Sequence, residues 1–120
     1  MSLLASIFVA LVAIEHAYIL ILEMFLWTRA RTQRVFGLPM ELAEKTTVLA
    51  ANQGLYNGFL SAGLIWSLVH PDALFGEQLQ MFFLGCVIVA AAYGSYSVKR
   101  SILIVQGLPA LIALTLVCLA

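Results

Sequence analysis

Charged residues are scarce in this chain of 120 residues. Six residues are Lys or Arg and six are Asp or Glu, so 10% of positions carry a charge, whereas about 25% is usual for a soluble domain. A soluble fold of this length exposes much of its surface to water, and so few charged groups could not cover that surface. The composition therefore excludes a soluble domain, a disordered tail and a nucleic-acid-binding protein with a basic face.

Cysteine is also rare, and its placement excludes several kinds of site. Cys86 and Cys118 form no CxxC pair, no metal-finger spacing and no disulfide framework. Free cysteine is readily buried as a small apolar residue, so both are predicted to serve in packing. No cofactor is predicted.

Hydrophobic residues, by contrast, make up 63% of the chain, and the mean hydropathy is +1.04. They form four long apolar stretches, each close to the roughly 20 residues that a helix needs to cross a bilayer. The sequence therefore predicts an all-α integral membrane four-helix bundle that occupies residues 1–120 as a single transmembrane domain. The predicted helices cover residues 3–27, 48–69, 79–97 and 102–119, and a cytoplasmic loop covers residues 28–47.

Basic residues occur only in the first and third of the three connections. By the positive-inside rule these connections are cytoplasmic, so both termini are predicted to be extracytoplasmic in a multi-pass protein of the bacterial inner membrane. No basic residue precedes the first apolar run, which argues against a signal peptide. Pro39 followed by two acidic residues predicts a short helix before the second span. The basic residues are Arg29, Arg31, Arg34, Lys45, Lys99 and Arg100.

Polar residues at membrane depth form the candidate site. Glu15, His16 and Glu23 lie in the first predicted helix, and ionisable residues at such depth usually face a bundle interior or a wet cavity. Since successive residues turn by 100°, His16 and Glu23 share one stripe and Glu15 lies beside it. Further polar side chains in the same cytoplasmic half complete a predicted ligand-binding pocket open to the cytoplasm; they are Asn52, Gln53, Tyr56, Asn57 and Gln106. The alternative is a network of interhelical hydrogen bonds that only holds the bundle together.

Small residues recur at four-residue spacing in the second predicted helix. Gly54 and Gly58, flanked by Ala50 and Ala62, would let another helix backbone approach closely. The predicted partner is the helix over residues 79–97, and the alternative is a second copy of the chain in a homodimer.

Several motifs together resemble a known family. They are Glu15-His16 with Tyr18, residues 22–25 with Trp27, residues 35–38, the run over residues 49–60, residues 83–87, and residues 105–109. The chain resembles the bacterial family known as domain of unknown function 1304, and the resemblance covers essentially the whole chain. It implies a small four-helix inner-membrane protein and brings no established activity with it.

The favoured function is that of a small-molecule or cation binder or carrier, with or without proton coupling. A carboxylate near the middle of the membrane could bind a cation or exchange a proton for a substrate, and binding would then depend on pH. The expected partners are the lipid bilayer, such a ligand and a second copy of the chain; nucleic acid is not expected.

Two other functions rank below this one. The first is an accessory subunit of a larger membrane complex. The second is a metal- or quinone-dependent enzyme in which Glu15, His16 and Glu23 are the candidate metal ligands. The enzyme ranks last because His16 and Glu23 are two helical turns apart, about 10.5 Å in rise, and could not reach one ion without another helix. No metal site is therefore predicted.

Overall fold

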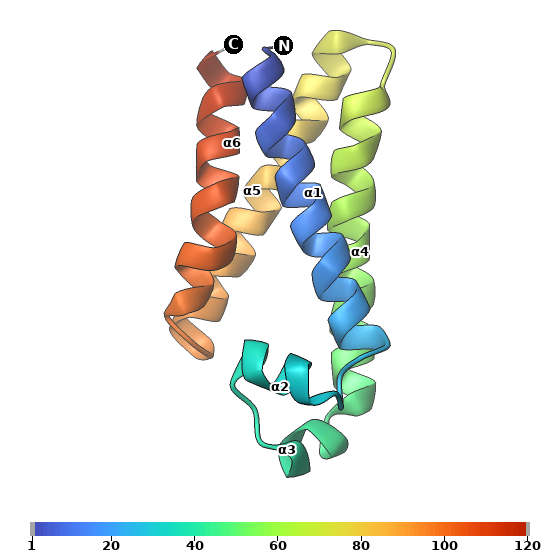
Figure 1. Cartoon of the computed structure of the whole chain (residues 1–120). Coiled ribbons are helices and arrows are strands. Elements are labelled where there is room, and N and C mark those ends of the chain that lie inside the picture. The colour runs from blue at the N-terminus through green and yellow to red at the C-terminus, as the bar shows by residue number, and fades with distance from the viewer. Residues whose placement is uncertain (1, 120) are drawn as a thin grey trace. The chain divides into compact units, whose positions relative to one another are not determined.

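The computed structural model describes residues 2–119, and every regular element in that range is helical. This confirms the predicted all-α class. Figure 1 shows the elements in order. They are α1 (Leu3–Met24), α2 (Ala30–Phe36), α3 (Met40–Lys45), α4 (Thr47–Val69), α5 (Ala73–Ser97), the π-helix η1 (Leu103–Gly107) and α6 (Leu108–Leu119).

The chain divides into two compact units, and α1 and α4 contribute to both. The first, here called the core unit, consists of Met1–Ile14 and Leu60–Ala120. The second, the polar unit, consists of Glu15–Phe59 and contains most of the predicted site residues.

Small and branched apolar side chains form the centre of the core unit. Ser61 of α4 reinforces this packing because its hydroxyl donates to the backbone carbonyl of Ala13 in α1 at 2.7 Å. In the same unit α5 lies beside η1 and α6 (Figure 1). The fully buried members of this core include Ala5, Val9, Val12, Leu64, Leu84, Val87, Ala110, Ala113 and Val117.

Helix α5 begins at Ala73, so the predicted start at residue 79 is wrong. The carboxylate of Asp72 caps the helix by accepting from the backbone N–H groups of Leu74 and Phe75 at 3.0 and 3.1 Å. Gly76 in the first turn brings α5 close to α4, because a Cβ there would lie 2.7 Å from the carbonyl oxygen of Ser67. Hydropathy located only the apolar part of this helix, whereas the cap determines where it starts.

The last predicted helix, over residues 102–119, is irregular at its beginning. Leu103–Gly107 form a π-helical turn that runs directly into α6. Pro109 follows this turn and has no N–H group, so it cannot donate the α-helical hydrogen bond to the carbonyl of Val105. The chain forms the wider π-helical turn where this hydrogen bond is missing. Turns of this kind recur at functional sites.

The predicted loop over residues 28–47 contains two short helices. Helix α3 follows Pro39, as predicted, whereas α2 was not predicted and ends at Gly37 in the left-handed conformation with φ 68°. Trp27 lies outside α1, which ends at Met24 instead of the predicted residue 27. Its indole N–H donates to the hydroxyl of Thr46 at 3.2 Å, and its ring meets that of Phe36 edge-on at 5.0 Å.

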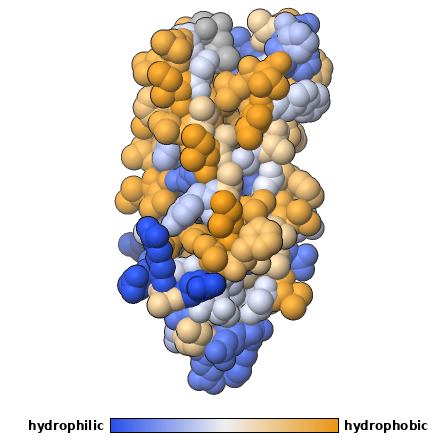
Figure 2. All heavy atoms as spheres, turned by 45° about the vertical axis from the view of Figure 1, so that its right-hand side comes forward, coloured by the Kyte–Doolittle hydropathy of each residue, from blue (hydrophilic) through white to orange (hydrophobic). Residues whose placement is uncertain are grey.

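Two helices, α1 and α5, are long and apolar enough by length and composition to cross a membrane. Helix α4 is long but carries more polar residues, and the apolar segment Leu103–Leu119 is shorter. Large hydrophobic side chains are exposed along these helices, and Figure 2 shows hydrophobic residues covering much of one face. Cys118 is among the exposed residues, so its predicted packing role is wrong; Cys86 is half-buried.

Candidate functional site

The best-defined polar contact of the polar unit joins α1 to α4. The side-chain amide of Asn57 donates to Oε1 of Glu23 at 2.6 Å, and Glu23 is only 9% exposed. The same amide nitrogen also donates to the backbone carbonyl of Gln53 at 3.1 Å, which fixes the orientation of Asn57 on its own helix. Asn57 thus holds the buried carboxylate in one position.

Gly54 and Gly58 allow this contact by removing side chains from the surface between the two helices. A Cβ at Gly54 would lie 2.7 Å from Cγ of Met24 and 3.0 Å from Cβ of Glu23. At Gly58 it would overlap the side chain of Leu20. The predicted partner of this surface, residues 79–97, is therefore wrong: the glycines pack against α1, because they lie on the same face of α4 as Asn57.

Glu15 and His16 lie about two helical turns from Glu23, towards the N-terminus of α1. His16 is 1% exposed, and its Nδ1 lies 3.8 Å from Oε1 of Glu15. That separation suits an ion pair when the imidazole is protonated but is too long for a hydrogen bond. Within residues 2–119, Oε1 of Glu15 is a buried oxygen without a hydrogen-bond donor. Its polar contact there is the longer one with Nδ1 of His16.

The other predicted α4 residues are not gathered around Glu23. The side chains of Asn52, Gln53 and Tyr56 are exposed, and Gln53 contributes only its backbone carbonyl to the site. The ring of Tyr56 contacts that of Phe59 edge-on, with centroids 5.8 Å apart. Four polar residues within six positions of one helix span too wide an arc to face α1 together.

Gln106 belongs to the core unit, where it is half-buried in the π-helical turn η1. Its predicted place in the ligand-binding pocket stays a prediction.

The candidate metal ligands do not form a metal centre. In the part of the chain that the structure describes, no three His, Cys, Asp or Glu residues are grouped so that they could hold an ion. Glu15, His16 and Glu23 therefore act as separate polar positions along α1. Two of them, Glu15 and Glu23, carry carboxyl groups.

Two buried polar residues without a hydrogen-bond partner among the described residues were not identified from the sequence. Gln80 is fully buried in α5, and neither atom of its amide has a hydrogen-bond partner within the described residues. Thr32 of α2 is 1% exposed, and its hydroxyl likewise has no partner there. In the sequence Gln80 follows Glu77 and Gln78 closely, and the predicted start at residue 79 placed it at a helix end, so nothing marked it as buried. Thr32 fell in a segment that was predicted to be a loop.

Comparison with known proteins agrees with the resemblance. The family model described as "Protein of unknown function (DUF1304)" matches residues 10–118. An "Uncharacterized protein YpaA" from Lactococcus lactis subsp. lactis (strain IL1403) is 36% identical over 116 residues, which cover 95% of this chain and 96% of that protein. No solved structure matches the chain. The chain therefore belongs to the DUF1304 family.

Proposed function

We propose that this chain is a multi-pass protein of the bacterial inner membrane that binds a cation at Glu23, with Glu15 as a second, separate acidic position on α1. Helices α1, α4, α5 and the η1–α6 segment would be its four spans, with the α2–α3 segment in the cytoplasm. The family by itself names no activity, so the proposal depends on the chemistry of the polar unit.

The exposure of the apolar helices supports membrane insertion. Only 33% of the apolar window of α1 and 22% of that of α5 are buried within the protein, whereas the core helix of a soluble protein would be mostly buried. Helix α4 has 23 residues, which at 1.5 Å per residue gives about 34 Å, enough for a hydrocarbon core of roughly 30 Å. Its polar residues raise the cost of insertion, and this cost is typical of functional positions in membranes.

The observation that carries the proposed ligand is the burial of the Glu23 carboxyl group without a Lys or Arg partner among the described residues. This carboxylate is nearly buried, and its hydrogen-bond donor is the neutral amide of Asn57. Within residues 2–119, the ion pairs are those of Glu15 with His16 and of Glu41 with Lys45, so no Lys or Arg pairs with Glu23. A buried anion without a cationic partner is costly, and a bound cation or a proton removes that cost.

The same arrangement supports exchange between a cation and a proton. Glu15 is a second acidic group on α1, and its Oε1 has no hydrogen-bond donor among the described residues. A cation that binds at these carboxylates would displace protons, which is the elementary step of a proton-coupled carrier.

Calorimetric titration of the detergent-solubilised protein with tetraphenylphosphonium tests the proposal. The wild-type chain is expected to bind this organic cation, and Glu23→Gln should weaken binding by tenfold or more, which corresponds to about 1.4 kcal/mol. Glu44→Gln is the matched control, because Glu44 is an exposed carboxylate on α3 of the same unit. Equal affinity of the wild-type chain and both variants would contradict a site at Glu23.

A further inference from the structure

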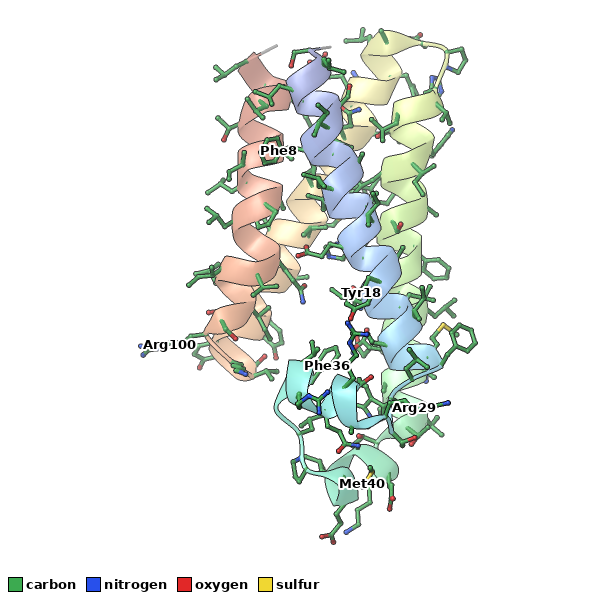
Figure 3. The ribbon with its side chains drawn as sticks, in the orientation of Figure 1. Phe8, Tyr18, Arg29, Phe36, Met40 and Arg100 are labelled. Atoms are coloured by element: carbon green, nitrogen blue, oxygen red, sulfur yellow. The ribbon has the colours of Figure 1, made fainter. Side chains whose placement is uncertain are left out.

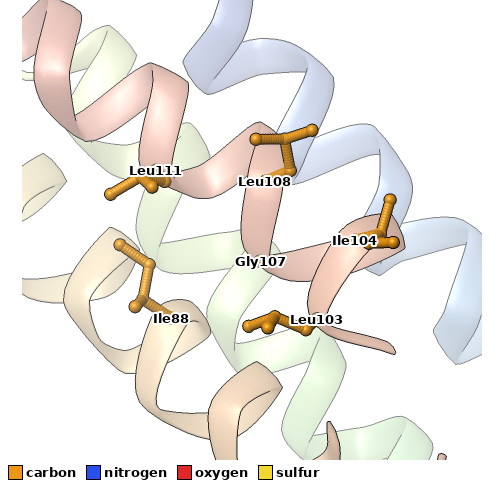
Figure 4. A pocket seen from close by; sticks show the side chains of 6 residues that line it. All are labelled: Ile88, Leu103, Ile104, Gly107, Leu108 and Leu111. Carbon is orange, nitrogen blue, oxygen red and sulfur yellow. The ribbon is translucent and has the colours of Figure 1, made fainter. Parts of the chain in front are cut away.

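The core unit carries an apolar groove where α5 meets the π-helical turn. Its volume is about 310 Å³ (Figure 4), at the lower end of the roughly 300–1,000 Å³ of small-molecule sites. Gly107 keeps η1 close to α5, because even a Cβ there would lie 3.3 Å from Cβ of Ala91. All lining side chains are hydrocarbon, and four of them are exposed, so the groove opens to the surroundings. The lining residues are Ile88, Leu103, Ile104, Gly107, Leu108 and Leu111.

Two basic residues lie at one end of this groove. Lys99 and Arg100 lie in the segment that connects α5 to η1. The backbone N–H of Leu103, which lines the groove, donates to the carbonyl of Arg100 at 3.1 Å, so these two residues are one turn apart. Both basic side chains are exposed, and Figure 3 shows Arg100 pointing away from the helices. No ion pair of the described residues involves either of them.

The acidic residues of the core unit cannot neutralise this end. They are Asp72 and Glu77, at the beginning of α5. The 20 residues from Glu77 to Ser97 at the end of that helix correspond to about 30 Å at 1.5 Å per residue. Within the core unit, the groove therefore has a hydrocarbon body and a cationic end.

We propose that this groove binds one phospholipid with an anionic headgroup. An acyl chain would lie along the groove, and the phosphate would lie at Lys99 and Arg100. The apolar surface of the groove binds an acyl chain whatever the lipid headgroup is, whereas basic residues beside membrane helices select anionic headgroups. The inference depends on the membrane insertion proposed above but not on the cation site at Glu23.

Native mass spectrometry of the chain extracted in a mild non-ionic detergent tests this site, with phosphatidylglycerol or phosphatidylcholine added at equal concentration. Wild-type protein should retain phosphatidylglycerol with roughly tenfold to thirtyfold preference, as expected for two basic residues near an anionic lipid. The double substitution Lys99→Gln and Arg100→Gln should remove this preference and leave retention of phosphatidylcholine unchanged. Lys45→Gln, which neutralises an exposed lysine on α3, should keep the preference.

The groove itself is tested by Leu108→Trp and, independently, Leu111→Trp, since either indole would fill it. In each of these variants, retention of phosphatidylglycerol and of phosphatidylcholine should fall at least tenfold. Ile112→Trp is the matched control, because Ile112 is a partly exposed α6 residue that does not line the groove. A variant counts as folded when its helical circular dichroism signal equals that of the wild-type protein. At least one of the two groove-filling variants, Leu108→Trp or Leu111→Trp, must be folded in this sense.

Three results would overturn the site. They are equal retention of the two lipids by wild-type protein, retention by a folded filled variant as high as in Ile112→Trp, and a dimer mass that the filled variants abolish, which would assign the groove to a second copy. Each leaves cation binding at Glu23 untouched. Recovery of the wild-type chain from the soluble fraction of cells would instead contradict the membrane insertion in the proposed function.

Discussion

The side-chain amide of Asn57 in α4 donates to the buried carboxylate of Glu23 in α1 at 2.6 Å. The contact requires the two helices to be close, and Gly54, one turn from Asn57, provides that closeness. A polar contact and a glycine contact thus form one structural feature of the polar unit. The first two predictions separate their contributions.

Gly54→Leu should lower the free energy of unfolding by about 1–3 kcal/mol, because its side chain would overlap Met24 and Glu23. Reversible unfolding in mixed detergent, followed by circular dichroism, measures the change. Gly85→Leu is the control, since a Cβ at Gly85 meets nothing within 4 Å. Equal tolerance of the two substitutions would show that Gly54 does not lie against α1.

Asn57→Ala should destabilise the protein by about 1–3 kcal/mol, because it leaves the buried Glu23 without its donor. Asn52→Ala, at an exposed position of the same helix, should change stability by less than about 0.5 kcal/mol. The double variant Asn57→Ala with Glu23→Gln should recover part of the loss, since the charge no longer requires compensation. If Asn57→Ala proves as mild as Asn52→Ala, the hydrogen bond contributes nothing to stability.

Gln80→Leu should raise the free energy of unfolding by about 1 kcal/mol. The amide of Gln80 is fully buried and has no partner within the described residues, and an apolar side chain of similar size does not need one. Gln78→Leu, at an exposed position of α5, serves as the comparison. A clear loss of stability in Gln80→Leu alone would show that its amide does have a partner.

Cysteine labelling tests the proposed topology. In a chain with Cys86 and Cys118 replaced by Ser, a membrane-impermeant maleimide applied to intact spheroplasts should label Ala73→Cys and not Arg34→Cys. Permeabilisation should then expose Arg34→Cys. The reverse pattern would place the α2–α3 segment outside.

The sequence predicted the helical class and the polar residues of α1, because composition and the 3.6-residue period act over long stretches. It did not locate local events that depend on single side chains. The cap at Asp72 moved the start of α5, and Gly37 ended a helix that hydropathy did not reveal. Spacing identified the small-residue surface of α4, but only the fold could show that it faces α1.

The central claim is that the Glu23 carboxylate itself receives the cation, and infrared difference spectroscopy tests it most directly. Adding tetraphenylphosphonium to the wild-type protein should change the carboxyl bands, because the charge beside Glu23 changes. The change in the carboxyl bands should be missing from the difference spectrum of Glu23→Gln and present in that of Glu44→Gln. A difference spectrum of Glu23→Gln identical to that of wild type would contradict the claim.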